Sequence, residues 1–146
     1  MKALIEKELS KFKDSKNYDG LDDSQYSKLE KMIFNDKENV PVSTTLHLLC
    51  TLKNKIGLEN DWQTDQWWNH VSDFASEHIS ETIEFIKTEC SADEFSTFSE
   101  IFDDIAQKTN SKEFIDAIKT TAKKFPEECS KFNIQGSIDD AESNLS

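Results

Sequence analysis

The residues of this sequence that could do chemistry are three histidines, three cysteines and 29 carboxylates. Metal sites on helices need histidine and carboxylate at fixed spacings, such as the Glu-x-x-His of di-iron bundles or the His-Glu-x-x-His of zinc proteases. Neither pattern occurs around His47, His70 or His78. The run from Asp19 to Asp23 is too short for a calcium loop and lacks the closing glutamate. We therefore expect no metal and no other cofactor.

A nucleophilic active site is not indicated either. The sequence has no glycine-flanked serine elbow, no glycine-rich phosphate loop and no cysteine in a context typical of an activated thiolate. Acid catalysis by paired carboxylates requires one of them to be desolvated, and helical periodicity places most of these acids on the solvent side. We expect a protein that is not an enzyme. A helical enzyme with scattered catalytic residues is the alternative to this expectation.

The carboxylates are concentrated in one part of the chain. Residues 61–105 hold twelve acids and a single lysine, Lys87, and so carry −11 of the net charge of −12. All 17 basic residues are lysines, so the bidentate arginine clamp for phosphate is missing. A charge this negative repels nucleic acid and anionic membranes and attracts basic proteins over long distances. We expect a basic protein partner, with no direct nucleic-acid contact and no membrane association.

The elements that must position these acids are predicted to be helices. Three glycines and two prolines are too few for the turns of an all-β protein of this length. Apolar spacing and helix-end signals predict helices over 3–14, from Asp22 or Asp23 to Phe34, from an N-cap at Ser43 to Gly57, over Thr64–Glu89, from the Ser91–Glu94 capping box to Ile105, and over Phe114–Phe125 after an N-cap at Asn110 or Ser111. Pro126 ends the last of these or begins a short seventh helix.

These helices are predicted to form one all-α domain. We expect a single compact bundle of about six or seven helices over residues 1–132, irregular rather than a symmetric four-helix bundle. Residues 133–146 have little to bury and are expected to form a flexible tail. The tripeptides Glu84–Ile86 and Glu113–Ile115 recur 29 residues apart, which is weak support for a helical repeat. An irregular bundle is therefore favoured over a repeat architecture.

The acids are expected on the outer faces of two helices. At 100° per residue, the members of the first face lie within about 80° of one another, opposite an apolar arc. The two faces comprise Asp73, Glu77, Glu81 and Glu84, and then Asp93, Glu100, Asp103 and Asp104. Solvated helix faces usually mix charge signs, because like charges one turn apart destabilise a helix, and five such pairs would cost on the order of 1–2 kcal/mol at low salt. We interpret the two faces as a surface relieved by a basic partner. The simpler interpretation is that they are solvated faces of amphipathic helices.

The three tryptophans flank this acidic region. The helical wheel places Trp68 and His78 in the apolar arc and Trp67 at its rim, while Trp62 lies in a polar context and is expected to be partly exposed. Aromatic anchors often dominate interface energies. The predicted partner-binding residues are Asp61, Trp62, Asp65, Trp67, Asp73, Glu77, Glu81, Glu84, Asp93, Glu100, Asp103 and Asp104. A core-capping role for Trp62 is the alternative to partner contact.

A small, acidic, arginine-free helical chain with its charge concentrated between Trp62 and Asp104 resembles the immunity proteins that bacteria pair with secreted or contact-delivered toxins. The resemblance covers the general character of residues 1–132. It implies an inhibitor that binds and neutralises a basic toxin, often a nuclease, without a cofactor. A nucleic-acid mimic of the type that phages use against defence nucleases would show the same features. A non-enzymatic helical adaptor or secretion chaperone is the other alternative.

The cysteines and the N-terminus bear on the compartment. Cys50, Cys90 and Cys129 are odd in number and widely spaced, as expected for reduced thiols rather than a disulfide framework. The first twelve residues alternate charged and apolar residues and do not resemble a secretory signal. We expect a cytoplasmic protein.

Overall fold

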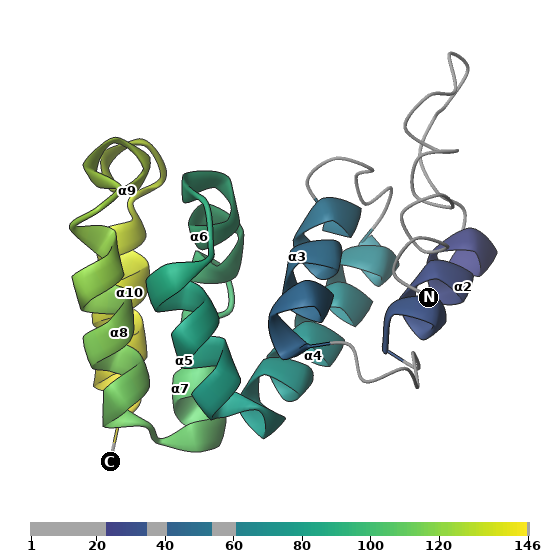
Figure 1. Ribbon diagram of the computed structural model, residues 1–146, viewed down its shortest axis with the longest axis horizontal. Coiled ribbons are helices and arrows are strands. Elements are labelled where there is room, and N and C mark those ends of the chain that lie inside the picture. The colour runs from purple at the N-terminus through teal and green to yellow at the C-terminus, as the bar shows by residue number, and fades with distance from the viewer. Residues whose placement is uncertain (1–22, 35–40, 54–60, 146) are drawn as a thin grey trace. The chain divides into compact units, whose positions relative to one another are not determined.

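The computed structural model describes residues 23–34, 41–53 and 61–145 of the chain. Every regular element in these ranges is a helix, which confirms the predicted all-α class. The described helices are α2 (Asp23–Phe34), α3 (Val42–Thr51), α4 (Asp61–Glu77), α5 (Ile79–Thr88), α6 (Ala92–Ser99), α7 (Phe102–Thr109), α8 (Lys112–Ala122), α9 (Pro126–Phe132) and α10 (Ile134–Ser143) (Figure 1). The helix predicted over 3–14 and the helix end predicted at Gly57 lie outside the described residues.

The nine helices of the described ranges exceed the six or seven predicted, in part because two long predicted helices are broken. The predicted helix over 64–89 begins at Asp61 and is interrupted at His78, whose φ of −116° and ψ of 47° are not helical. The Thr82 hydroxyl lies 2.9 Å from the carbonyls of Ala75 and His78, so its single proton is shared between two acceptors next to the break. The next helix is interrupted in the same way at Ile101, where φ is −118° and ψ is 10°.

Two predicted helix caps are confirmed. The Ser91 hydroxyl accepts a hydrogen bond from the Glu94 amide at 3.2 Å, and the Glu94 carboxylate accepts one from the Ser91 amide at 2.9 Å, so the capping box is formed. Of the two alternatives for α8, Ser111 is the N-cap, since its hydroxyl accepts from the Phe114 amide at 3.1 Å. Asn110 instead ends α7 in the left-handed conformation, with a φ of 49°.

The N-cap predicted at Ser43 is wrong. Helix α3 begins at Val42, and its N-cap is Pro41, whose carbonyl accepts from the Thr44 amide at 3.0 Å. Proline fixes φ near the value that an N-cap position tolerates, and this preference outweighs the capping hydroxyl of Ser43. The predicted apolar face of this helix is confirmed, because Leu46, Leu48, Leu49 and Leu52 are all buried.

The chain divides into two compact units, one up to His70 and one from Val71 onwards. The division falls inside α4, where no linker composition marks it, and the one domain over residues 1–132 stays a prediction. In the first unit α2 packs against α3, with Tyr26, Leu29 and Ile33 buried as predicted.

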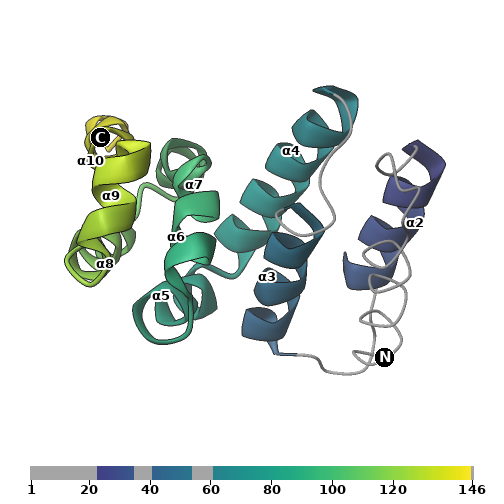
Figure 2. The same ribbon diagram turned by 90° about the horizontal axis from the view of Figure 1, so that it is seen from above.

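The second unit contains two copies of a three-helix arrangement. Helix α5 packs against α8, α6 against α9, and α7 against α10. Figure 2 shows α5, α6 and α7 in one row and α8, α9 and α10 in the next. The sequences agree with this pairing at an offset of 32 residues, because residues 81–88 (ETIEFIKT) and 113–120 (EFIDAIKT) share five of eight positions. The unit therefore has an internal duplication.

Some residues of the two copies agree at this offset. Thr88 and Thr120 each donate a hydrogen bond to the carbonyl four residues earlier, at 2.8 and 2.9 Å. The buried residues of α7 and α10 also match at this offset, as Phe102 corresponds to Ile134 and Ala106 to Ile138. The tripeptides Glu84–Ile86 and Glu113–Ile115, which recur 29 residues apart, therefore do not occupy equivalent positions in the two copies. Two copies are fewer than the three or more that build a solenoid.

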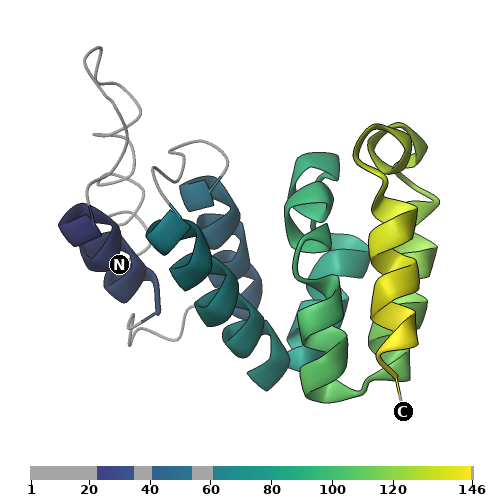
Figure 3. The ribbon, with the colours of Figure 1, turned by 180° about the vertical axis from the view of Figure 1, so that it is seen from behind.

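The expectation that residues 133–146 have little to bury is wrong. These residues include α10, which packs along α7 and α8 and buries Ile134, Ile138 and Ala141 (Figure 3). Asn133 adopts a left-handed conformation, with a φ of 51°, and so ends α9 and starts α10 directly. The apolar residues of α10 recur at i, i+4 and i+7, but they are few, and their burial depends on a partner helix that the local pattern does not reveal.

Candidate partner-binding surface

The predicted partner-binding residues differ in exposure. Asp61, Trp62, Asp65, Asp73, Glu77, Glu81, Glu84, Asp93, Glu100 and Asp103 are exposed, Asp104 is half-buried, and Trp67 is completely buried. Asp61, Trp62, Asp65 and Trp67 belong to the first unit, and the other eight belong to the second. Exposure therefore supports ten of the twelve as surface residues.

Glu77, at the end of α4, and Glu81 and Glu84, on α5, are three acids of the second unit that lie close together in the sequence, and we call them the α5 acidic surface. All three are exposed, and none forms an ion pair with any cation of the described ranges. Glu77 is the last residue of α4, where a negative charge opposes the helix dipole. Glu81 lies in the first turn of α5, where the dipole favours it. The break at His78 means that the predicted single stripe from Asp73 to Glu84 does not lie on one continuous helix.

Asp73 differs from these three because a lysine neutralises it. Lys108 of α7 donates to the Asp73 carboxylate at 2.6 Å and to the Ser72 hydroxyl at 2.8 Å. The sequence argument that lysines are placed away from the acidic faces is therefore wrong at this position. Lys108 lies 35 residues from Asp73, so a helical wheel of one helix could not reveal the pair.

Asp103 and Asp104 lie in the same neighbourhood. The pKa of the Asp104 carboxyl is raised, mainly by burial and then by the charge of Asp103, with Asp73 adding to the rise and Lys108 opposing it. The Asp103 carboxylate accepts the Asp104 amide at 3.0 Å, in the first turn of α7. Acids at a helix start satisfy free amides and the helix dipole. Asp93 occupies the same position in α6. The contribution of these acids to helix stability therefore explains the presence of Asp93 and Asp103 without a partner.

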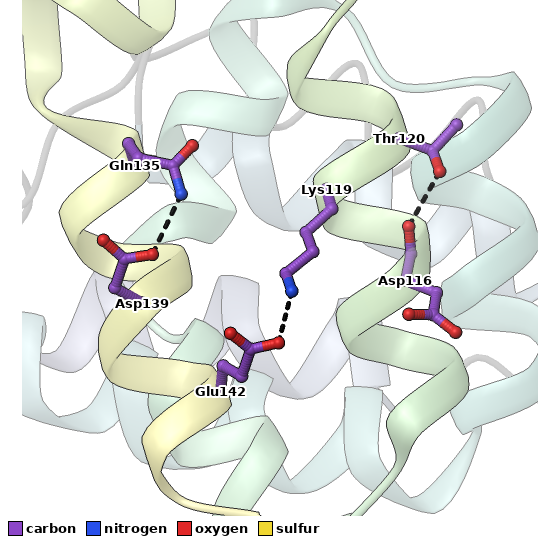
Figure 4. Close-up of polar contacts among 6 residues, drawn as sticks. All are labelled: Asp116, Lys119, Thr120, Gln135, Asp139 and Glu142. Atoms are coloured by element: carbon purple, nitrogen blue, oxygen red, sulfur yellow. Dashed lines mark hydrogen bonds and ion pairs between the residues drawn. The ribbon is translucent and has the colours of Figure 1, made fainter.

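The second copy differs from the first in the contacts of its lysine. Glu113 and Asp116 of α8 correspond to Glu81 and Glu84 of α5. Next to them Lys119 forms an ion pair with Glu142 of α10, and its pKa is raised by that hydrogen bond and by the charges of Asp116 and Asp139 (Figure 4). The corresponding lysine of α5, Lys87, forms no ion pair among the described residues. The copies therefore differ in the ion pair of this lysine, while Glu113 and Asp116, like Glu81 and Glu84, are exposed and form no ion pair with a described residue.

The burial predicted for Trp67 and Trp68 is reversed in the structure. Trp67, predicted at the rim, is fully buried, and its Nε1 donates to the Leu49 carbonyl of α3 at 3.0 Å. Trp68, predicted in the core, is half-buried. Lys53 covers the Trp67 ring, with Nζ 4.8 Å from the ring centroid. The helical wheel assumed packing on one side only, whereas α3 reaches the side of α4 that carries Trp67. Trp62 is 43% exposed, as expected.

One chemically capable group was not predicted. Glu30 of α2 is nearly buried, and its two carboxylate oxygens accept from the Tyr26 hydroxyl and contact Nδ1 of His70, both at 2.5 Å. Burial and this hydrogen bond raise the pKa of Tyr26 far above its ordinary value. One partner on each carboxylate oxygen holds Glu30 in a single orientation. His70 lies 40 residues away in sequence, so no local spacing could identify the pair.

Comparisons with protein-family models, with curated proteins and with solved structures found no match to this chain. The functional argument therefore depends on the chain's own side chains. Within the described ranges, no helix has the length and hydropathy needed to cross a bilayer.

The described residues contain no group of three or more histidines, cysteines, aspartates or glutamates placed to hold a metal ion. His78, predicted in the apolar arc, is half-buried and packs against Phe74, with ring centroids 4.8 Å apart. Burial raises the pKa of the Cys90 thiol to about 12, and burial also raises the pKa of Cys129. Thiols with raised pKa values are poor nucleophiles at neutral pH. Among the groups described, the exposed carboxylates and Trp62 are the best candidates for function.

Proposed function

We propose that this chain is a non-enzymatic inhibitor that binds a basic protein through its α5 acidic surface. The observation that carries the proposal is that Glu77, Glu81 and Glu84 are exposed and form no ion pair with the cations of the described ranges. The same unit contains neutralised acids for comparison, at Asp73 and Glu142. The α5 carboxylates are thus available to the cations of a partner.

The energetic argument concerns what an acidic surface without counter-charges costs. Glu81 and Glu84 are like-charged neighbours one turn apart on α5, which destabilises a helix by a few tenths of a kcal/mol, and Glu77 opposes the dipole of α4. Lysines or arginines of a partner would remove both penalties on binding. A surface of this sign also accelerates encounter with a basic protein, with association rates of about 10⁸ per molar per second at low salt.

The kind of partner follows from charge and from the resemblance in composition to bacterial immunity proteins. We propose a toxin domain, and specifically a nuclease, because the surface that binds phosphates is basic and is complementary to clustered carboxylates. Inhibition in the cytoplasm then occurs by covering that surface. A phage-type mimic of nucleic acid would act by the same contacts, and competition between this chain and DNA for the captured nuclease would be expected for both.

A pair of variants with equal charge tests the proposal. The partner is captured from extract at low salt, eluted with a salt gradient, purified, and titrated against the wild type, the E77Q/E81Q/E84Q variant and the D116N/D139N/E142Q variant. The second variant removes three charges around Lys119 instead of three charges from the α5 acidic surface. We expect the first variant to weaken binding by about tenfold or more and to reduce the salt dependence, with less effect from the second. Equal affinities of the wild type and the E77Q/E81Q/E84Q variant would contradict the proposal.

The internal duplication favours a second candidate, a helical adaptor. Stacked helical repeats commonly provide extended surfaces for partner segments. An adaptor that binds through apolar contacts would show an affinity insensitive to salt and to the E77Q/E81Q/E84Q substitutions. The same titrations therefore separate the two candidates.

A further inference from the structure

Trp62 is an exposed aromatic residue with a fixed orientation. Its side chain is 43% exposed, and Trp62 and Phe132 are the exposed large apolar residues of the described ranges. The indole packs edge-on against Tyr26, with ring centroids 6.1 Å apart and an interplanar angle of 78°. Tyr26 is itself fully buried and hydrogen-bonded to Glu30. The exposed indole is therefore anchored on the core of the first unit.

Two carboxylates of α4 lie near Trp62 in the sequence, and the spacing of Asp65 places it on the same side of the helix. Asp61 directly precedes Trp62, and Asp65 follows it by three residues, a spacing that places side chains next to one another on a helix. Both aspartates are exposed, and neither forms an ion pair with a described residue. Gln63 additionally holds the Asp23 carboxylate beside the start of α4, by a hydrogen bond of 3.1 Å. An aromatic ring and negative charge therefore occur together at this helix start.

This combination is complementary to a cation. Cations bind over indole rings by cation–π attraction, and the neighbouring carboxylates add a charged hydrogen-bond acceptor. Another tryptophan of the chain already has a cation over its ring, since Lys53 lies over Trp67. No described lysine lies over Trp62. Stacking of a nucleobase on Trp62 is disfavoured, because the adjacent carboxylates repel the phosphates of its strand.

An arginine fits better than a lysine. The guanidinium is planar, stacks on an aromatic face and bonds a carboxylate through two parallel N–H donors, whereas an ammonium is compact and strongly hydrated. A second copy of this chain cannot supply the group, because all 17 of its basic residues are lysines. The occupant must therefore come from a different protein.

We infer that Trp62, Asp61 and Asp65 form a docking site for an arginine side chain of a basic partner protein. The inference rests on the proposed function in that it assumes a basic partner, and it adds the residue type recognised and a second contact region, in the first unit. The guanidinium stacks on the exposed part of the Trp62 indole, and the Asp65 carboxylate accepts its hydrogen bonds.

The test uses the full chain and two peptides of equal charge, acetylated hexa-arginine and acetylated hexalysine. The indole N–H resonance of Trp62, assigned by its loss in the W62F variant, is followed at low salt as each peptide is added. We expect hexa-arginine to shift this resonance and to bind about two- to fivefold more tightly than hexalysine. The W62A and D65N variants should each weaken hexa-arginine binding by a similar factor, measured for W62A by calorimetry. The D140N variant removes the same charge from α10 and serves as the control for D65N.

Several outcomes would overturn the inference. They are equal affinity for the two peptides, an unchanged Trp62 resonance, or W62A and D65N variants that bind hexa-arginine as well as D140N does. A Trp62 resonance that shifts with protein concentration alone would indicate self-association and would also overturn it. Circular dichroism shows whether W62A remains folded, and D65N gives an answer if it does not. The proposed function is tested separately, because the E77Q/E81Q/E84Q variant alters the second unit and leaves Trp62 and its aspartates intact.

Discussion

At the scale of single residues, Trp67 is the side chain that joins α4 to α3. It is fully buried, and its indole N–H donates to the Leu49 carbonyl. The W67F variant keeps a ring but leaves this carbonyl without its donor and leaves space beside Lys53. We expect the free energy of unfolding to fall by about 1–3 kcal/mol, measured by urea denaturation. The W62F variant, at an exposed position, should change it by less than about 0.5 kcal/mol. Equal effects of the two substitutions would contradict the assignment of Trp67 to the core.

Lys53 gives a prediction about pH. Burial lowers the pKa of its ammonium from 10.5 to about 8 in the folded chain, so between these values the unfolded state binds more protons and stability rises with pH. The Trp67 ring favours the charged form and opposes part of this effect. We expect the K53M variant to be more stable than the wild type at pH 7 by about 1 kcal/mol, after allowance for solvent screening. The difference should disappear near pH 10.5, as measured by urea denaturation at both pH values. A constant difference would mean that Lys53 does not titrate in this range.

Single residues also show where prediction from sequence succeeds. Phe95, Phe98, Ile101, Phe102 and Ile105 recur at helical spacing and are all buried, so the spacing along the chain is enough to identify such a face. It could not predict the contacts of Asp73 with Lys108 or of Glu30 with His70, because those depend on how separate helices pack. The exposed acids of the candidate surface were predictable, but which of them are neutralised was not.

At the scale of elements, α10 provides a direct test of the corrected view of the C-terminus. A chain ending at Asn133 lacks Ile134, Ile138 and Ala141, and it also exposes the sides of α7 and α8 that α10 covers. Burial of an aliphatic side chain stabilises by about 1.5–3 kcal/mol, so this truncation should lower the free energy of unfolding by about 3–5 kcal/mol. Thermal and urea denaturation measure the change.

A shorter truncation is the control for this experiment. A chain ending at Asn144 keeps all of α10 and the hydrogen bond from the Asn144 side chain to the Asp103 carbonyl. It should lose less than about 1 kcal/mol. If both truncated chains are as stable as the full chain, the packing of α10 contributes nothing and residues 133–146 are a tail after all.

The helix breaks show a limit of prediction at this scale. Neither His78 nor Ile101 is a glycine or a proline, so the sequence contains no local signal for an interruption. At His78 the break is bridged by Thr82, whose hydroxyl lies between the carbonyls of Ala75 and His78. The caps at Ser91 and Ser111 were predictable, because a capping side chain and the amide that it satisfies lie within one turn.

At the scale of the whole molecule, the all-α class followed from composition and periodicity, but the duplication did not. In the sequence the two copies are visible only in α5 and α8, where residues 81–88 (ETIEFIKT) and 113–120 (EFIDAIKT) share five of eight positions. The remaining helices of the two copies keep the packing but not the residues, and Phe98 of α6, which is fully buried, has an exposed serine, Ser130, at the offset of 32. The copies have also diverged in charge balance. Lys119 pairs with Glu142 of α10 in the second copy, whereas the corresponding Lys87 of α5 forms no ion pair with a described residue in the first.

This difference predicts opposite effects of neutralising the two groups of acids. The E77Q/E81Q/E84Q variant removes repulsion between carboxylates that form no ion pair, and it also removes a charge that opposes the dipole of α4. We expect it to raise the melting temperature at low salt by about 1–3 °C. The increase should shrink as sodium chloride is raised to about 0.5 M, because salt screens the repulsion that the substitutions remove.

The D116N/D139N/E142Q variant removes the same number of charges but takes them from around Lys119, whose raised pKa shows that the folded state favours its protonated form. This variant should lower the melting temperature at low salt, and added salt should reduce that loss as well. Differential scanning calorimetry of both variants at several salt concentrations decides the matter, because the net charge is the same and only the location differs. If both variants are stabilised equally, the net charge of −12 alone controls stability. The α5 acidic surface would then be an ordinary solvated face, and the stability argument for a basic partner at that surface would be lost.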